Sequence, residues 1–286
     1  LFCRGHSLFV GVPGLAKTLL VSTLSRVLNL TFSRIQFTPD LMPADVIGTN
    51  IMMEKSGERF FQFQQGPLFS QIVLADEINR ATPKTQSALL EAMQERSITV
   101  AGKTRELDLP FFVLATQNPI EMEGTYPLPE AQIDRFFFKI NVNYPDFDEL
   151  KEIILRTTTG KLPQIDTALT AEELLQLQKL IRKIPISSKI IDYVIKIILS
   201  TQPSNNESPD IVKKYVKYGS SPRGAQALIL AAKSRAFMEN RFNVTVEDIK
   251  KVVYPALRHR LLLNFEGEAS SDINLNNLIS EIIKSI

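Results

Sequence analysis

The chain has 286 residues, 44% of them hydrophobic and 22% charged, and its 33 Lys and Arg against 31 Asp and Glu leave a net charge of +2. This length favours two domains, because a single core stops growing near about 250 to 300 residues. The near-neutral charge gives no support for a nucleic-acid partner, the single Cys3 excludes an internal disulfide framework, and no apolar stretch approaches the roughly 18 residues of a membrane span, so we expect a cytoplasmic protein.

A short apolar run at residues 7–10 leads through a loop into a helix predicted over 17–29. Gly11 and Gly14 let consecutive N–H groups of the loop turn inward, toward the positive end of the helix dipole. This arrangement is typical of phosphate binding, with Lys17 contacting the β- and γ-phosphates and the Thr18 hydroxyl ligating Mg²⁺. The stretch alone also fits a strand-to-helix turn with an incidental Lys-Thr pair.

Ala16 stands where the usual G-x-x-x-x-G-K-[ST] pattern has its last glycine. Alanine adds one methyl group and is excluded only where φ must be positive. We therefore interpret Ala16 as a tolerated variant of the phosphate-binding loop.

The following segments predict a parallel sheet. Residues 31–37 alternate as a strand does, whereas 72–75, 111–115 and 136–140 are short apolar runs, which are typical of strands covered on both faces. Because a strand, a helix and a strand follow one another, the sheet is expected to be parallel.

Two insertions interrupt this alternation, near residues 50–63 and 97–107. Each has a turn-forming centre, Ser56-Gly57 in the first and Ala101-Gly102 in the second, and both are predicted to be surface hairpins. Whether they touch a partner stays open at this point.

From about residue 143 apolar residues recur at helical spacing in place of the earlier strand-like runs. We therefore expect one domain over 1–142 and a helical one over 143–286. Helix N-terminal caps are predicted at Thr170, Ser221 and Thr245.

Asp76 and Glu77 directly follow the apolar run at 72–75. The carboxyl ends of parallel strands meet at the ligand-binding edge of a sheet, so these carboxylates are expected beside Lys17 and Thr18. Asp76 is suited to hold Mg²⁺, and Glu77 is suited to orient and deprotonate a water molecule. Alone, the pair would also fit a solvated strand end.

Three more polar residues are candidates, each with an ordinary alternative. Asn118 ends the next strand and could contact the γ-phosphate, or it could form an Asn-Pro turn. Arg135 could reach a neighbouring subunit's nucleotide, or it could pair with Asp134. Arg223 lies in the first turn of a helix, where a cation opposes the dipole, so a phosphate or a nearby carboxylate should compensate it.

The assembled motifs resemble those of the AAA+ ATPases and, within them, the MoxR family. The resemblance rests on the segments at residues 11–18, 75–81, 84–93, 115–119, 128–136 and 221–223 and covers nearly the whole chain. Ala16 is also what this family has at that position.

The resemblance implies an α/β fold, a P-loop AAA+ three-layer domain with a five-stranded parallel sheet, followed by an all-helical lid. It makes Asp76 and Glu77 the Walker B residues, Asn118 sensor one, Arg135 the arginine finger and Arg223 sensor two, with Arg80 a weaker candidate at a subunit boundary. The ATP-binding loop would comprise Gly11, Val12, Pro13, Gly14, Leu15, Ala16, Lys17 and Thr18, with Thr18 and Asp76 holding Mg²⁺.

The family binds ATP between the protomers of a ring, usually a hexamer, and its two hairpins are thought to face the pore. The resemblance implies a chaperone-like ATPase that remodels or activates protein complexes, often with a von Willebrand factor A domain partner. The alternatives are a magnesium-chelatase-like motor, which shares both insertions, and a nucleotide-gated scaffold with little hydrolysis. A GTPase is disfavoured because no Asn-Lys-x-Asp motif occurs. The two histidines, His6 and His259, are expected at a strand edge or on a helix surface, without catalytic roles.

Overall fold

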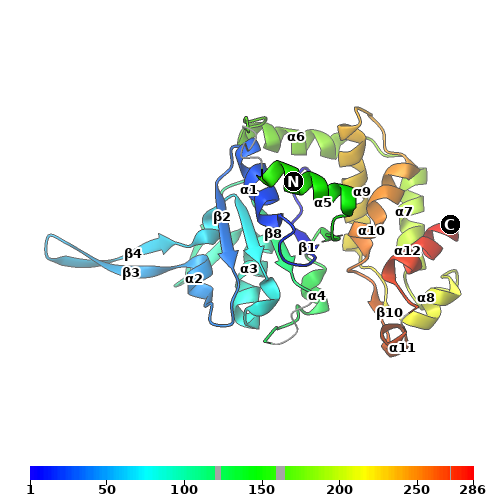
Figure 1. The fold of residues 1–286 in the computed structure, drawn as a ribbon, viewed down its shortest axis with the longest axis horizontal. Coiled ribbons are helices and arrows are strands. Elements are labelled where there is room, and N and C mark those ends of the chain that lie inside the picture. The colour runs from blue at the N-terminus through cyan, green and yellow to red at the C-terminus, as the bar shows by residue number, and fades with distance from the viewer. Residues whose placement is uncertain (120–123, 159–164, 271) are drawn as a thin grey trace. The chain divides into compact units, whose positions relative to one another are not determined.

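Strands and helices alternate in the first half of the chain, and helices prevail in the second half (Figure 1). The structure, a computed structural model, describes residues 1–119, 124–158, 165–270 and 272–286. The strands are β1 (Ser7–Val10), β2 (Phe32–Gln36), β3 (Gly48–Lys55), β4 (Glu58–Gln65), β5 (Ile72–Asp76), β6 (Ser97–Val100), β7 (Lys103–Glu106), β8 (Phe112–Gln117), β9 (Phe138–Asn141), β10 (Val216–Tyr218) and β11 (Leu262–Leu263). The α-helices are α1 (Lys17–Val27), α2 (Pro43–Ile47), α3 (Pro83–Glu95), α4 (Glu130–Ile133), α5 (Phe147–Thr158), α6 (Ala171–Lys183), α7 (Ser188–Ser200), α8 (Asp210–Tyr215), α9 (Pro222–Met238), α10 (Val246–Leu257), α11 (Phe265–Ala269) and α12 (Leu275–Lys284).

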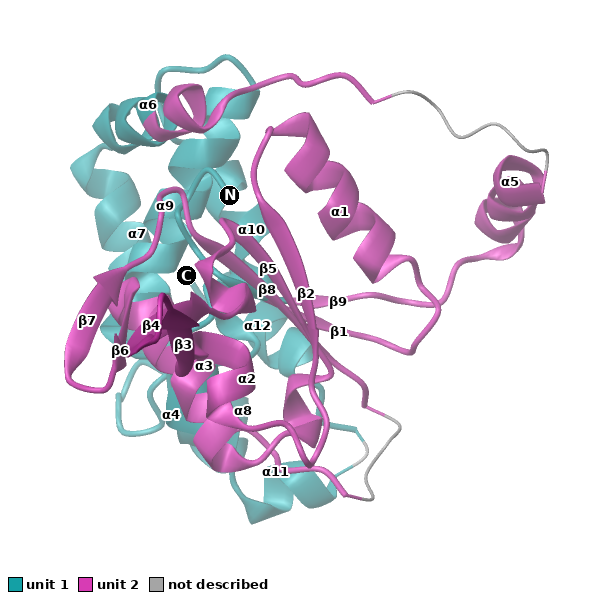
Figure 2. Cartoon of the chain, turned by 90° about the vertical axis from the view of Figure 1, so that its left-hand side faces the viewer, with its two compact units in different colours: residues 1–7, 129–139, 176–286 teal, residues 8–128, 140–175 magenta. Residues whose placement is uncertain are grey.

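The predicted five-stranded parallel sheet is confirmed, with the strand order β2-β5-β8-β1-β9. β5 pairs in parallel with β2 and with β8, and this register sets Gln36 opposite Asp76. The apolar run that forms most of β5, Ile72, Val73, Leu74 and Ala75, has no exposed surface. Figure 2 shows why, because α1 lies on one side of the sheet and α2 and α3 lie on the other.

The chain forms two compact units (Figure 2). Unit 1 comprises Leu1–Ser7, Pro129–Lys139 and Gln176–Ile286, and unit 2 comprises Leu8–Leu128 and Ile140–Leu175. The segment around Arg135 thus belongs to the same unit as most of the C-terminal helices. The domain boundary between residues 142 and 143 stays a prediction.

The apolar faces of α7, α9, α10 and α12 form the core of unit 1. Val194, Leu228, Val253 and Leu278, one from each helix, are fully buried in it. A two-stranded antiparallel sheet of β10 and β11 adds to these helices. Its strands are too short for their alternation to be seen in the sequence.

The predicted helix caps are confirmed. The hydroxyl oxygens of Ser221 and Thr245 accept hydrogen bonds from the N–H groups of Arg223 and Asp248, at 3.2 Å and 3.4 Å. Thr170 likewise accepts the N–H of Glu173, whose carboxylate in turn accepts the N–H of Thr170. Such caps satisfy N–H groups that have no partner inside the helix.

The first insertion is a long antiparallel hairpin of β3 and β4, paired from Gly48 and Gln65 to Lys55 and Glu58. Ser56 and Gly57 at its tip both have positive φ, at 57° and 83°, which matches the twist of a tight hairpin turn. The hairpin projects away from the sheet of unit 2 (Figure 1). The second insertion is the shorter hairpin of β6 and β7, which confirms both predictions.

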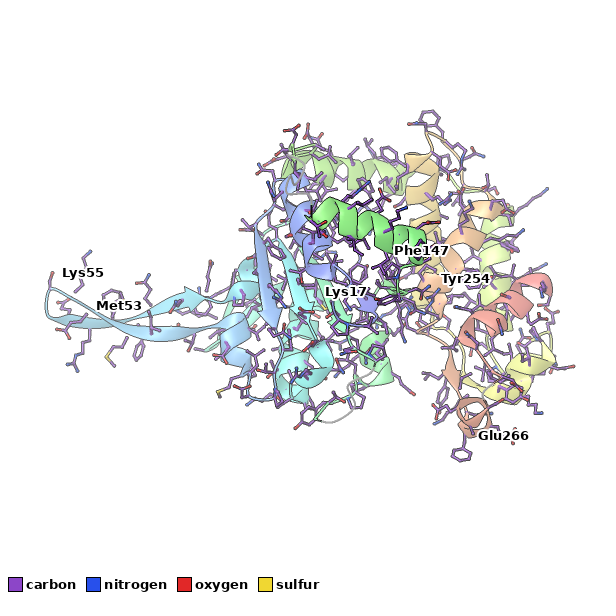
Figure 3. All side chains as sticks on the ribbon, in the orientation of Figure 1. Lys17, Met53, Lys55, Phe147, Tyr254 and Glu266 are labelled. Carbon is purple, nitrogen blue, oxygen red and sulfur yellow. The ribbon has the colours of Figure 1, made fainter. Side chains whose placement is uncertain are left out.

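Apolar side chains line the projecting hairpin. Met52, Met53, Phe60 and Phe61 are 59%, 40%, 43% and 72% exposed. Figure 3 shows Met53 and Lys55 on this arm, well away from Lys17. Near the base of the arm, the guanidinium carbon of Arg105 in β7 lies 4.0 Å from the centre of the Phe63 ring, so the two hairpins are in contact.

Candidate functional site

The loop between β1 and α1 depends on its glycines for two different reasons. At Gly14 the backbone has φ +84°, and a Cβ atom there would meet nothing within 4 Å, so the conformation favours glycine. At Gly11 the reason is space, because a Cβ atom would lie 2.5 Å from the carbonyl oxygen of Val142. The loop therefore turns sharply and passes close to the chain that follows β9.

The backbone conformation of Ala16 differs from the expected one. Its φ of 51° and ψ of 21° are left-handed, so the expectation that this position does not need positive φ is wrong. The cost for a non-glycine residue is about 1 to 2 kcal/mol. The carbonyl of Ala16 accepts the N–H of Leu20 at 3.0 Å, so the start of α1 fixes this conformation.

Lys17 lies against the loop. Its Nζ donates hydrogen bonds to the carbonyl oxygens of Gly11 and Val12, at 2.6 Å and 3.1 Å. Partial burial lowers the pKa of Lys17, while the negative charges of Asp76 and Glu77 act in the opposite direction. The ammonium group is therefore held at the loop and within electrostatic reach of both carboxylates.

Thr116 of β8 positions both carboxylate residues. Its hydroxyl donates a hydrogen bond of 2.6 Å to Oδ1 of Asp76 and accepts the N–H of Glu77 at 2.9 Å. Glu77 has a left-handed φ of 57°. Strain of this kind gathers at functional sites, and here the buried Thr116 holds it in place.

Strand β2 and the turn after β5 supply further partners. Arg34 donates to Oδ2 of Asp76 from Nε at 3.1 Å and from Nη2 at 2.6 Å. Gln36 and Arg80 donate to Oε2 of Glu77, at 2.8 Å and 3.0 Å. Sequence reasoning missed Arg34, Gln36 and Thr116. For Arg34 and Gln36, the alternation of polar residues at the carboxyl end of 31–37 was a usable signal.

A pocket with a volume of about 420 Å³ lies between the loop before α1 and the carboxyl ends of β5 and β8. Ligand sites commonly have volumes of about 300 to 1,000 Å³. The pocket is lined by five of the predicted site residues, Lys17, Thr18, Asp76, Glu77 and Asn118. The remaining lining residues are Pro13, Gly14, Leu15, Ala16, Leu19, Arg34 and Thr116.

Arg135 and Arg223 belong to unit 1. Arg135 is exposed and follows Asp134 directly. The Nη1 atom of Arg223 lies 3.4 Å from a carboxylate oxygen of Asp134, so a nearby carboxylate compensates this cation at its helix N-terminus.

His259 is not on a helix surface as expected, because it is 6% exposed in the turn after α10. His6, which directly precedes β1, is 7% exposed. Nε2 of His259 lies 2.9 Å from the carbonyl oxygen of Phe136. Next to it, the Arg260 side chain is only 3% exposed and forms an ion pair of 2.9 Å with Asp134. Nothing in the local sequence indicated this, because the partners lie more than a hundred residues away.

The chain is similar to known proteins over its whole length. A profile of the family described as "ATPase family associated with various cellular activities (AAA)" matches residues 6–138, and one of the "AAA lid domain" matches residues 209–282. "Chaperone MoxR1" of Mycobacterium tuberculosis is 45% identical over 99% of this chain and 75% of that protein. The chain belongs to the MoxR family of AAA+ ATPases.

Two further relatives match the chain over its full length. "Uncharacterized protein YeaC" of Bacillus subtilis is 41% identical over 100% of this chain and 86% of its own length. The crystal structure of a candidate ATPase from Cytophaga hutchinsonii has 44% identity and a TM-score of 0.92, over 100% of this chain and 86% of that one. The α/β AAA+ fold with a helical lid, predicted for this MoxR-family chain, is thereby confirmed.

Two kinds of structure are absent from the described ranges of this MoxR-family chain. None of the helices there combines the length and the apolar character needed to cross a membrane. Nor does any cluster of three or more His, Cys, Asp or Glu side chains there form a ready metal cage.

Proposed function

We propose that this MoxR-family protein hydrolyses ATP in the pocket between α1 and the carboxyl ends of β5 and β8. The proposal rests mainly on one observation, the convergence of Lys17, Thr18, Asp76, Glu77 and Asn118 on that pocket. The residues come from three separate chain segments, and phosphoryl transfer depends mainly on such positioning and on charge.

The pocket fits a triphosphate with Mg²⁺. The first turn of α1 has N–H groups without partners inside the helix, and Lys17 adds a positive charge beside them. Thr18 and Asp76 supply hard oxygen ligands, which Mg²⁺ prefers alongside water and phosphate. Bound there, the ion would neutralise charge on the phosphate oxygens.

Glu77 is proposed to orient and deprotonate the attacking water. Its carboxylate accepts hydrogen bonds from Gln36 and Arg80, and its backbone is held by Thr116. A base must be fixed within hydrogen-bond reach of its proton, and these contacts hold both the carboxylate and the backbone of Glu77. Asn118, 6% exposed, is proposed to hydrogen-bond the water or the γ-phosphate from the neighbouring strand.

Arg135 and Arg223 are proposed to complete the site in an assembly. Arg135 would act on the nucleotide of an adjacent copy in a ring, for which we propose a hexamer, and Arg223 would respond to the γ-phosphate in its own subunit. Support comes from the exposure of Arg135 and from the long contact of Arg223 with Asp134, which an anion can replace.

The work driven by hydrolysis is proposed to be the remodelling of other cytoplasmic protein complexes, with a von Willebrand factor A domain protein as a partner. The exposed Met52, Met53, Phe60 and Phe61 on the projecting hairpin support a contact with protein. Flexible methionine and aromatic side chains suit surfaces that accept varied partners.

Replacing Glu77 with glutamine tests the proposal. We expect ATP binding to be retained and phosphate release to fall by about a hundredfold or more, because a general base contributes about 10² to 10⁴ in rate. Glu95→Gln, at the exposed end of α3, is the matched control. Unchanged turnover in Glu77→Gln would remove Glu77 from the mechanism.

Two further measurements test the assembly. Particle size with and without ATP tests ring formation. A mixture of Arg135→Ala and Lys17→Ala proteins tests action between copies, because mixed interfaces should regain turnover. A wild-type ring that binds ATP without releasing phosphate would instead indicate the nucleotide-gated scaffold, and a stimulated chelatase reaction would indicate the chelatase motor.

A further inference from the structure

We propose that Arg260 and His259 are positioning residues for Arg135, holding the backbone on both sides of it so that the end of α10 sets where Arg135 is presented. This inference rests on the proposed function, in which Arg135 acts on the nucleotide of an adjacent copy. All the residues concerned belong to unit 1.

Arg260 contacts the chain on both sides of Arg135. Its Nε donates to Oδ1 of Asp134 at 2.9 Å, and its Nη2 donates to the carbonyl of Asp134 at 3.3 Å. Beyond Arg135, Nη2 donates to the carbonyl of Phe136 at 2.8 Å and Nη1 donates to that of Phe137 at 3.2 Å. Nη1 also donates to the carbonyl of Ala256 in α10, so one guanidinium joins that helix to the segment 134–137.

His259 adds a second contact at the same place. Its Nε2 lies 2.9 Å from the carbonyl oxygen of Phe136, which Arg260 also binds. The other ring nitrogen, Nδ1, is buried and has no hydrogen-bond partner among the described residues. A neutral ring that donates from Nε2 leaves Nδ1 without a proton, which is the less costly state there.

Burial makes these contacts rigid. The Arg260 side chain is 3% exposed, and a buried charge persists only where hydrogen bonds replace its water shell. Phe136 is fully buried beside it, whereas Arg135 between them is exposed. The structure thus fixes the backbone around Arg135, while Arg135 itself is exposed.

Asp134 extends the same network to the start of α9. Its Oδ2 accepts the hydroxyl of Ser221 at 3.1 Å and lies 3.4 Å from Nη1 of Arg223. One carboxylate therefore links the N-cap of α9, the proposed nucleotide-sensing Arg223, and Arg260. Movement of α9 and α10 would carry the Arg135 segment with it.

The competing explanation is that Arg260 supports only the fold of its own subunit. The two explanations differ in which nucleotide site loses activity. A displaced Arg135 impairs the neighbour's site, whereas a damaged lid impairs the subunit's own site. Mixing experiments separate these outcomes.

The test uses Arg260→Lys, which keeps the charge but cannot reach all five acceptors. We expect turnover of the pure variant to fall by at least about tenfold with ATP affinity retained, because a displacement of about 1 Å can cost 10²-fold. Turnover should return when the Arg260→Lys protein is mixed with the Lys17→Ala protein, because the latter supplies an intact Arg135 to the nucleotide site of the former. It should not return with Arg135→Ala, because neither copy then donates a well-placed arginine.

Controls and a second readout accompany this test. Arg258→Lys is the matched control, because the Nε atom of Arg258, the C-cap residue of α10, donates to the carbonyl oxygen of Tyr254 in that helix. His259→Leu should resemble Arg260→Lys, whereas His259→Gln keeps a donor and should retain most of the turnover. In hydrogen exchange, amides of residues 134–138 should exchange at least about tenfold faster in Arg260→Lys, with those of α12 unchanged.

The outcomes distinguish the two proposals. Recovery of Arg260→Lys with Arg135→Ala, or unchanged exchange at 134–138, would overturn the positioning role and leave the proposed function intact. Failure of the reference mixture of Arg135→Ala and Lys17→Ala would overturn action between copies, and the positioning role with it.

Discussion

The hydroxyl of Thr116 donates a hydrogen bond of 2.6 Å to the carboxylate of Asp76, from the strand next to it in the sheet. The same oxygen accepts the N–H of Glu77 at 2.9 Å. One buried side chain thus orients the residue proposed to hold the metal ion and the residue proposed to activate water. Their geometry is set by the pairing of β5 with β8.

Thr116→Val keeps the volume of the side chain and removes both hydrogen bonds. We expect turnover to fall by about tenfold or more, because a hydrogen bond to a charged group contributes about 1.5 to 3 kcal/mol. ATP affinity should change less, since Lys17 and the loop are untouched. Steady-state phosphate release and nucleotide titration check this, and Thr116→Ser should keep near-normal turnover.

Ala16→Gly should leave stability unchanged or raise it by up to about 1 kcal/mol. Relief of the left-handed conformation favours folding, whereas the freer unfolded chain opposes it by about 0.5 to 1 kcal/mol. Ala16→Val should destabilise the protein, because a β-branched side chain fits positive φ poorly. Chemical unfolding of the three proteins measures the order, and equal stability of the valine variant would contradict the strained loop.

The capping boxes at Thr245 and Thr170 should differ in strength. In the first, Asp248 is 1% exposed and its Oδ2 accepts the hydroxyl of Thr245 at 2.9 Å, whereas the corresponding Glu173 of the second is exposed. We expect Thr245→Ala to cost about 2 kcal/mol and Thr170→Ala about 0.5 kcal/mol, the two ends of the range for such caps. Thermal unfolding measures both, and a larger loss for Thr170→Ala would reverse this ranking.

His259 should make stability depend on pH. Burial, followed by the charge of Arg260, lowers its pKa to about 3. The unfolded chain takes up this proton near pH 6.5 and the folded chain does not until about pH 3. The contribution to stability is therefore complete above pH 6.5 and is lost progressively as the pH falls.

At pH 5 the loss from this group is about 2 kcal/mol relative to pH 8. His259→Gln removes the titrating group, so its unfolding free energy should fall less between these pH values than that of the wild type. Urea unfolding of both proteins at the two pH values measures the difference. An identical pH dependence would show that His259 titrates normally.

Local patterns in the sequence were sufficient to predict the strands of the five-stranded sheet and the convergence of Lys17 with Asp76. Apolar runs without alternation predicted β5 and β8, and the rule that parallel strands end at one edge brought their polar ends together. The roles of these residues stay predictions, although their positions agree with them.

Interactions between distant segments could not be predicted in the same way. Arg34 meets Asp76 only because β2 pairs with β5 in one register, and a shift by one residue would turn its side chain to the other face. His259 is buried because the chain near Phe136 passes over it, 123 positions away. The left-handed Ala16 follows from the closure of its loop, which outweighs the local preference of alanine.

The grouping of Pro129–Lys139 with the C-terminal helices matters for anyone who wishes to study half of this protein alone. A recombinant fragment ending at residue 142 would carry Phe136 and Asp134 without the guanidinium that binds them. Its last strand would expose apolar rings and uncompensated carbonyl groups to solvent, and such a fragment should aggregate. Useful dissection of this chain would retain both ends and shorten only the projecting arm.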